Sequence, residues 1–133
     1  MRRRKKTRID GPHLAVVEEV ADDIYSIKFI LQSLRYQVRS FSYSQPFLEE
    51  LVEFTPKMII VDMMIPMGGG FDVIRHIRSH PELKQTPLLA ITADAMEGKA
   101  EDVIKAGGQD YLAKPYAVGE LQEKLEHWIQ EPE

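Results

Sequence analysis

Apolar and polar positions along the chain form strand-like and helix-like segments in alternation. Continuous apolar runs predict buried strands over residues 13–17, 57–62 and 86–92, and a short fifth strand is predicted over residues 110–113. An alternating run over residues 36–41 predicts an edge strand. Helical spacing of apolar residues predicts helices over residues 22–34, 45–54, 70–80 and 98–108, and a last one marked by Val118, Leu121, Leu125 and Trp128. In the second helix, Pro46 is expected in the first turn.

Five strands that alternate with five helices predict α/β architecture. The strands pair in parallel through right-handed crossovers, and helices cover both faces of the sheet. A chain of 133 residues is long enough for one such domain with a substantial core.

Composition excludes several classes of protein. A hydrophobic content of 44% with 29% charged residues is typical of a globular chain, and the absence of cysteine excludes disulfides and thiolate chemistry. No apolar stretch reaches the length of a membrane span, and no secretory signal is present. We therefore expect a soluble, cytoplasmic protein with no membrane partner.

Positive charge is concentrated at the N-terminus. The first eight residues hold six of the 17 Lys and Arg, which leaves 11 basic against 21 acidic residues in the remainder. We expect residues 1–11 to be a disordered basic tail and residues 12–131 to be the folded domain. An acidic body repels phosphate backbones, so we expect no nucleic-acid binding by this domain.

Polar residues follow four of the predicted strands. Glu18 and Glu19 end the first strand, Asp62 the third, Thr92 the fourth and Lys114 the fifth. Ligands of open α/β sheets bind at the carboxyl ends of strands, so these side chains are expected to face one crevice. Three carboxylates repel one another unless a cation balances them, and hard oxygen ligands favour Mg²⁺. A lysine and a hydroxyl on the opposite side of the crevice from the carboxylates complete a set of groups that indicates a phosphoryl-binding site.

Four segments, "VVEE", "IIVDMMIPMGGGFDVI", "LLAITADA" and "AGGQDYLAKPY", together resemble the receiver domain of two-component response regulators, over residues 13–129. The resemblance implies a doubly wound, flavodoxin-like sheet in the order 2-1-3-4-5. It implies that Asp62 accepts a phosphoryl group from a phosphohistidine of a histidine kinase or phosphotransfer protein. It further implies that Glu19, Asp62 and the Met64 carbonyl ligate Mg²⁺, with Glu18 acting through water. Thr92, Ala93 and Lys114 are implied to bind the phosphoryl group, and Thr92 and Tyr111 to act as the switch. The bond before Pro115 is implied to be cis.

The resemblance also implies how such a protein signals in a phosphorelay. The domain catalyses its own phosphorylation and is otherwise no enzyme. Phosphorylation then changes a face built from the fourth helix, fifth strand and fifth helix, which binds a downstream target; a homodimer is left open. No output domain follows Glu133, so the switch acts through another protein unless the chain was cut from a longer one.

Three positions depart from the family's pattern. Glu19 stands where aspartate is usual, and its extra methylene changes the reach of a metal ligand. Gly69 replaces an acid in the loop after Asp62, and Met64 offers no group to orient a water, which predicts a long-lived phosphoryl group. Because of Glu19, a second function stays open, in which the domain is a receiver-like interaction module that works without phosphorylation. A flavin-binding flavodoxin-like protein and an aspartate-nucleophile phosphatase fit less well, because their phosphate loop and second aspartate are missing.

Overall fold

The computed structural model describes residues 11–18, 21–43, 46–63, 69–93 and 99–129, with the backbone alone for residues 21–26 and 99. The strands are β1 (His13–Val17), β2 (Gln37–Phe41), β3 (Met58–Asp62), β4 (Leu88–Thr92) and β5 (Asp110–Ala113). The helices are α1 (Ala21–Ser33), α2 (Leu48–Phe54), α3 (Gly69–Arg78), the short 3₁₀ helix η3 (Pro81–Leu83), α4 (Lys99–Ala106) and α5 (Val118–Trp128).

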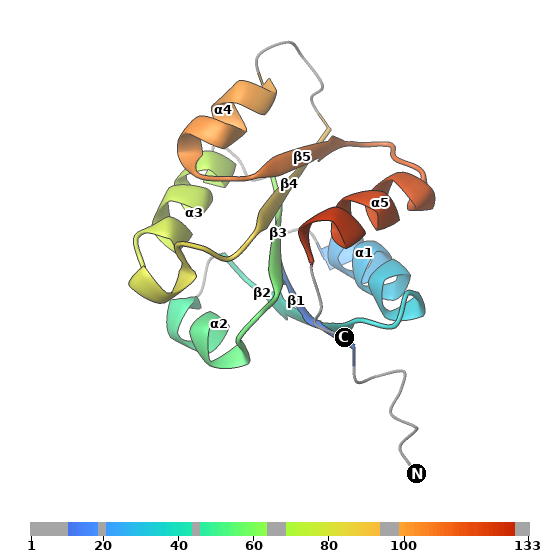
Figure 1. Ribbon diagram of the computed structural model, residues 1–133, viewed down its shortest axis with the longest axis horizontal. Coiled ribbons are helices and arrows are strands. Elements are labelled where there is room, and N and C mark those ends of the chain that lie inside the picture. The colour runs from blue at the N-terminus through green and yellow to red at the C-terminus, as the bar shows by residue number, and fades with distance from the viewer. Residues whose placement is uncertain (1–10, 19–20, 44–45, 64–68, 94–98, 130–133) are drawn as a thin grey trace.

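The five strands form one parallel sheet in the order β2-β1-β3-β4-β5. Helices α1 and α5 cover one face, and α2, α3 and α4 cover the other (Figure 1). This confirms the predicted α/β class, the strand order and the position of the second strand at an edge. Strand order reverses between β1 and β3, so the carboxyl ends of these two strands flank the crevice in which such folds bind ligands.

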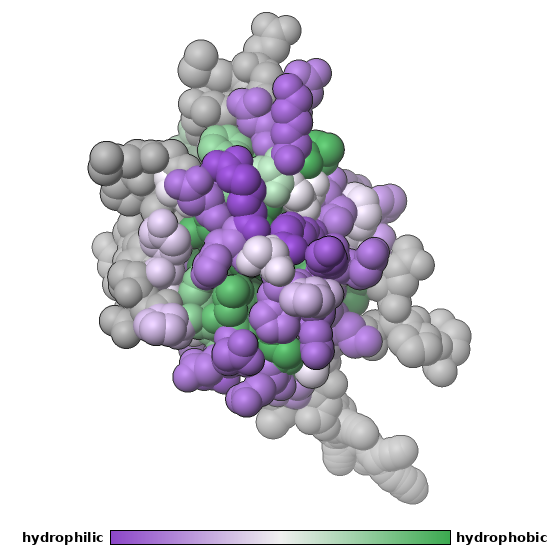
Figure 2. All heavy atoms as spheres, turned by 90° about the vertical axis from the view of Figure 1, so that its left-hand side faces the viewer, coloured by the Kyte–Doolittle hydropathy of each residue, from purple (hydrophilic) through white to green (hydrophobic). Residues whose placement is uncertain are grey.

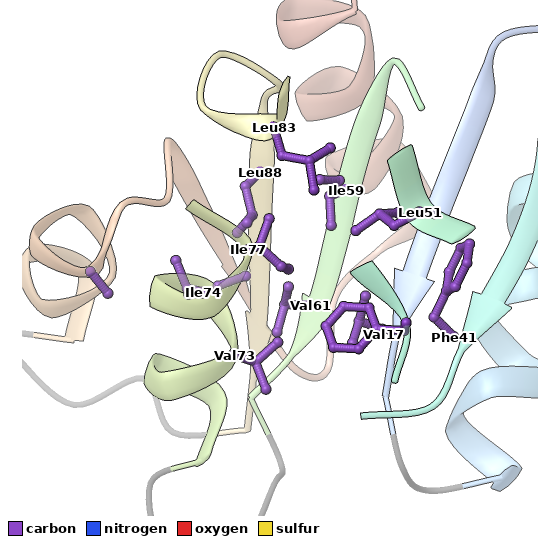
Figure 3. Packing of buried hydrophobic residues seen from close by; sticks show 14 of the residues in the cluster. Val17, Phe41, Leu51, Ile59, Val61, Val73, Ile74, Ile77, Leu83 and Leu88 are labelled. Carbon is purple, nitrogen blue, oxygen red and sulfur yellow. The ribbon is translucent and has the colours of Figure 1, made fainter. Parts of the chain in front are cut away.

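The pleat of the sheet divides the core into two clusters. In β3, Ile59 and Val61 pack into a cluster under α2, α3 and α4, whereas Met58 and Ile60 pack into one under α1 and α5. Successive side chains of a strand point to opposite faces, which explains the division. We call these the α3-side cluster and the α1-side cluster; Figure 3 shows the first, where Val17 and Leu88 from neighbouring strands also meet the helices.

The second helix begins later than the sequence predicted. Phe47 is its N-cap with φ −134° and ψ −11°, so Pro46 precedes the helix and is not in its first turn. The Phe47 side chain is buried against the α3-side cluster and contacts the ring of His76. Burial of this ring fixes the backbone in a non-helical conformation, which a pattern of local spacing does not register.

Glycine ends α4. Gly107 has φ +120°, and the amides of Gly107 and Gly108 both donate to the carbonyl of Val103. A side chain is strained at that φ, so glycine ends the helix at low cost.

Hydrophilic side chains cover most of the described surface over α2, α3 and α4, with hydrophobic atoms showing between them (Figure 2). No helix among the described residues is long and apolar enough to cross a membrane. The predicted basic tail lies outside the described residues, apart from Gly11.

Candidate functional site

Two carboxylates are buried at the carboxyl ends of adjacent strands. Glu18 follows β1 directly and is 2% exposed, and Asp62 is the last residue of β3 and is 3% exposed. Charged side chains are rarely buried to this extent unless they are paired or bind an ion. Their position therefore marks this edge of the sheet as a site for cations.

One lysine meets this acidic edge from the other side of β4. Lys114 follows β5, and its Nζ donates a 2.9 Å hydrogen bond to Oδ2 of Asp62. The peptide bond between Lys114 and Pro115 is cis, as the resemblance implied. The sheet thus holds an ammonium and a carboxylate in contact, although 52 positions separate them in the sequence.

A cavity of about 530 Å³ opens beside this pair. Among the described residues, its charged lining consists of Glu18, Asp62 and Lys114, next to Ala93. Its remaining walls are apolar or aromatic and come from α1, β4 and the segment after β5: Ile27, Ile30, Ile91, Pro115 and Tyr116. The cavity is therefore charged at one end and apolar over the rest of its surface.

Tyr111 lies on the other face of the sheet, and Thr92 stands at the end of β4. Tyr111 packs against the α3-side cluster, while its neighbour Leu112 lies in the α1-side cluster. Thr92 is 7% exposed, follows Ile91 of the α1-side cluster, and is not among the residues that line the cavity. The sequence predicted that Glu18, Glu19, Asp62, Thr92 and Lys114 face one crevice. Of these, Glu18, Asp62 and Lys114 line the observed cavity, together with Ala93.

The metal ligands that the resemblance implied are partly described. Glu18 and Asp62 supply carboxylate oxygens, which are hard ligands suited to Mg²⁺, so the residues present fit this ion. Glu19 and Met64 lie outside the described residues. Within the described ranges, no three His, Asp or Glu side chains are grouped closely enough to hold a metal. A complete set of protein ligands would therefore need the undescribed positions.

A second polar cluster joins β5 to α5. Asp110 accepts hydrogen bonds from Lys124 Nζ and Trp128 Nε1, each at 2.9 Å, and from the amide of Tyr111 at 2.8 Å. Burial raises the pKa of Asp110, but these three donors outweigh that effect and leave the pKa below its usual value. The carboxylate therefore fastens the last helix to the start of the last strand.

A third polar cluster lies under α3. Arg78 donates to the carbonyl of Gly107 at 2.8 Å, to the carbonyl of Leu83 and to Oε1 of Gln109 at 2.7 Å. Gln109 Oε1 also accepts from the amide of Leu88 at 2.7 Å. Burial lowers the pKa of Arg78. One guanidinium thus ties together the ends of α3, η3 and α4.

The apolar walls of the cavity were not recognised in the sequence. Ile27 fits the helical pattern of α1, and Ile30 was not singled out. Tyr116 is the last residue of the segment "AGGQDYLAKPY", and the resemblance implied no role for it. A weak signal was present, because residues 27 and 30 lie one turn apart on a helix that begins beside the predicted acid pair.

These features define a parallel α/β domain with a buried aspartate, an acidic neighbour and a lysine at its ligand-binding edge. The family model for the response regulator receiver domain matches residues 14–126. The chain therefore belongs to the family of response regulator receiver domains.

Among curated proteins, the chain is 33% identical over 110 residues to the transcriptional regulatory protein GltR of Pseudomonas aeruginosa. That match covers 80% of this chain and 46% of GltR. The chain thus spans about half the length of this relative, whose other part has no counterpart in the match.

Solved structures agree with the fold. The receiver domain of sensor histidine kinase PA1611 from Pseudomonas aeruginosa, a structure with magnesium coordinated in its active site cleft, has a TM-score of 0.78 and 31% identity and covers 90% of this chain and 98% of its own. The chemotaxis protein CheY4 of Vibrio cholerae has a TM-score of 0.79 and 21% identity, with coverage of 89% and 98%. At that identity the second likeness bears on the fold alone.

Proposed function

We propose that this domain accepts a phosphoryl group on Asp62 from the phosphohistidine of a histidine kinase or phosphotransfer protein. The observation that carries the proposal is the 2.9 Å contact between Lys114 Nζ and a buried Asp62 carboxylate that shares its cavity with Glu18. A buried nucleophile beside a fixed ammonium is an arrangement that favours phosphoryl transfer, because charge that develops on the phosphoryl oxygens meets a preorganised cation.

The transfer exchanges one bond for another. An oxygen of Asp62 forms a bond to phosphorus while the bond between phosphorus and the donor's imidazole nitrogen breaks, and its electron pair stays on that nitrogen. Lys114 donates hydrogen bonds to the phosphoryl oxygens in place of its bond to Asp62, and Glu18 helps to hold the cation. Bound Mg²⁺ supplies charge that balances the acids and the phosphoryl oxygens. The domain acts on itself, so we class it as an acceptor and not as an enzyme.

The acyl phosphate then alters the domain's surface. Thr92 ends β4 and Tyr111 lies on β5, so both stand between the acceptor and the face that carries α4. We propose that the Thr92 hydroxyl binds the phosphoryl group and that Tyr111 changes position with it. A target protein would read this change on the face of α4, β5 and α5, in a cytoplasmic two-component pathway.

Mass spectrometry after incubation with phosphoramidate and Mg²⁺ tests the proposal. We expect one adduct of about 80 Da on the wild type and none on Asp62→Asn, because a carboxylate is the nucleophile. Asp72→Asn is the matched control: Asp72 is an exposed aspartate on α3 that pairs with Arg75, and this variant should take up the group as the wild type does. An adduct on Asp62→Asn would refute the assignment of the acceptor. No adduct on any protein would instead favour a phosphorylation-independent interaction module.

A further inference from the structure

The apolar walls of the cavity beside Asp62 have no role in phosphoryl transfer. Ile27 and Ile30 from α1 and Ile91 from β4 line it together with Pro115 and Tyr116. A phosphoryl group and its ion need charged and polar partners, which stand at one end. The volume of about 530 Å³ lies within the range of roughly 300–1,000 Å³ that small-molecule sites occupy.

The charge at the polar end selects the sign of a ligand. Among the described residues that line the cavity, two carboxylates face one ammonium, so one negative charge is in excess. Glu18 and Asp62 are both almost fully buried, and a carboxylate in such surroundings favours a nearby cation more strongly than one in water does. Without bound Mg²⁺, an anion would meet repulsion at the same place.

We propose that this cavity binds a small organic ammonium ion with an apolar body. Its cationic head lies between Glu18 and Asp62, and its body lies against Ile27, Ile30 and Tyr116. Charge complementarity places the head, and the hydrophobic effect places the body.

Such a ligand would regulate phosphorylation. Its head occupies the carboxylates that the proposed function assigns to Mg²⁺, so the two cations compete, and this part of the inference rests on that function. A monovalent head that excludes the divalent ion leaves the incoming phosphoryl oxygens without the charge that would balance them. The compound would then act as an inhibitor whose effect falls as the Mg²⁺ concentration rises.

The first test compares three probes on the wild-type protein by NMR titration. Phenethylammonium carries the charge and the apolar body, 2-phenylethanol lacks the charge, and methylammonium lacks the body. We expect phenethylammonium to bind at least about tenfold more tightly than either of the others, because each lacks one of the two contributions. Equal affinity of phenethylammonium and methylammonium would overturn the role of the apolar walls, and equal affinity of 2-phenylethanol would overturn the role of the acids.

Two variants on adjacent positions of α1 locate the site. Ile30→Asn puts a polar side chain of similar size into the cavity wall and should weaken phenethylammonium at least about fivefold. Phe29→Asn is the matched control, since Phe29 is 73% exposed and does not line the cavity, and its affinity should equal that of the wild type. Equal weakening by both variants would overturn the placement. The probe series on the wild type decides the question if Ile30→Asn does not fold.

Competition separates this inference from the proposed function. Phenethylammonium should raise the apparent Kd for Mg²⁺ in proportion to its own concentration, and should slow the uptake of phosphate from phosphoramidate. Mg²⁺ binding and phosphorylation that phenethylammonium leaves unchanged would refute the inference alone. Tight, charge-dependent binding of phenethylammonium to a protein that takes up no phosphoryl group would refute the proposed function and retain the site.

Discussion

Lys114 Nζ lies 2.9 Å from Oδ2 of Asp62, although β4 stands between the strands that carry the two residues. The Asp62 side chain is buried, whereas that of Lys114 is 26% exposed. The acid depends on this partner more than the lysine does, because a buried charge without a partner is costly and an exposed one is solvated by water.

Replacement of Lys114 and replacement of Asp62 should therefore change the free energy of unfolding by different amounts. We expect Lys114→Met to lower the free energy of unfolding by about 1–3 kcal/mol, since it leaves the Asp62 carboxylate without its charged donor. Lys114→Met combined with Asp62→Asn should cost less than the sum of the two single changes. Urea unfolding of the four proteins in a double-mutant cycle measures this coupling, and additive changes would show that the contact contributes nothing to stability.

Binding of Mg²⁺ should depend on the side chain at position 19. Glu19→Asp should tighten Mg²⁺ and speed the phosphorylation of Asp62, because the shorter side chain suits the strict geometry of this ion. Glu19→Gln should weaken both, because it removes a ligand charge. The shift of the melting temperature with Mg²⁺ concentration reports each affinity. If all three proteins respond equally to Mg²⁺, Glu19 is no ligand, and a phosphorylation-independent module becomes the better account.

Deletion of residues 1–8 should leave the melting temperature and phosphate uptake unchanged. A terminal run of like charges buries little surface and so contributes little to folding. Differential scanning calorimetry measures the melting temperatures of the shortened and full-length chains, and mass spectrometry measures their phosphate uptake. A fall of several degrees would reveal a folded contact for this segment.

The cluster at Asp110 should make stability depend on pH. Because the folded protein lowers the pKa of this carboxyl, its contribution is present above the unfolded pKa, at about 3.9, and is lost as the pH falls through the folded value. The difference in unfolding free energy between wild type and Asp110→Asn should therefore be larger at pH 7 than at pH 3. Asp72→Asn removes an exposed ion pair and should show a much smaller difference. Equal pH profiles for the two variants would contradict the role of the Lys124 and Trp128 donors.

Arg78 should stabilise the fold more than its neighbour Arg75. Arg78→Met keeps the aliphatic stem but leaves the carbonyls of Gly107 and Leu83 without this donor, so we expect a loss of about 1–3 kcal/mol. Arg75 makes an exposed pair with Asp72, and Arg75→Met should change stability by at most about 0.5 kcal/mol. Chemical unfolding of both variants checks the difference, and equal losses would show that the buried hydrogen bonds are not the cause.

Continuous apolar runs made the sheet predictable. The first strand begins and ends where the sequence placed it, at His13–Val17, because a buried parallel strand is apolar on both faces. The last strand, at the edge of the sheet, also has the predicted bounds, Asp110–Ala113. The helix boundaries were less accurate where tertiary packing decides: Phe47 leaves helical geometry to bury its ring before α2 begins.

The charged part of the site was predictable because each residue directly ends or follows a strand. Glu18, Asp62 and Lys114 needed only the rule that parallel strands end at one edge. The clusters of Arg78 and Asp110 were not predictable, because their partners lie up to 31 positions away and no local pattern joins them. Strand alternation, which the sequence also carries, accounts for the position of Tyr111 on the side of the sheet opposite the cavity.

That alternation gives the domain two separate surfaces for two kinds of event. Glu18, Asp62 and Lys114 open toward α1, while Tyr111 packs toward α3, and the thickness of the sheet stands between them. A molecule seated in the cavity and a protein contacting the α4 part of the proposed face of α4, β5 and α5 would not occupy the same surface. Both could be bound at the same time, and a molecule that blocks one surface would leave the other accessible.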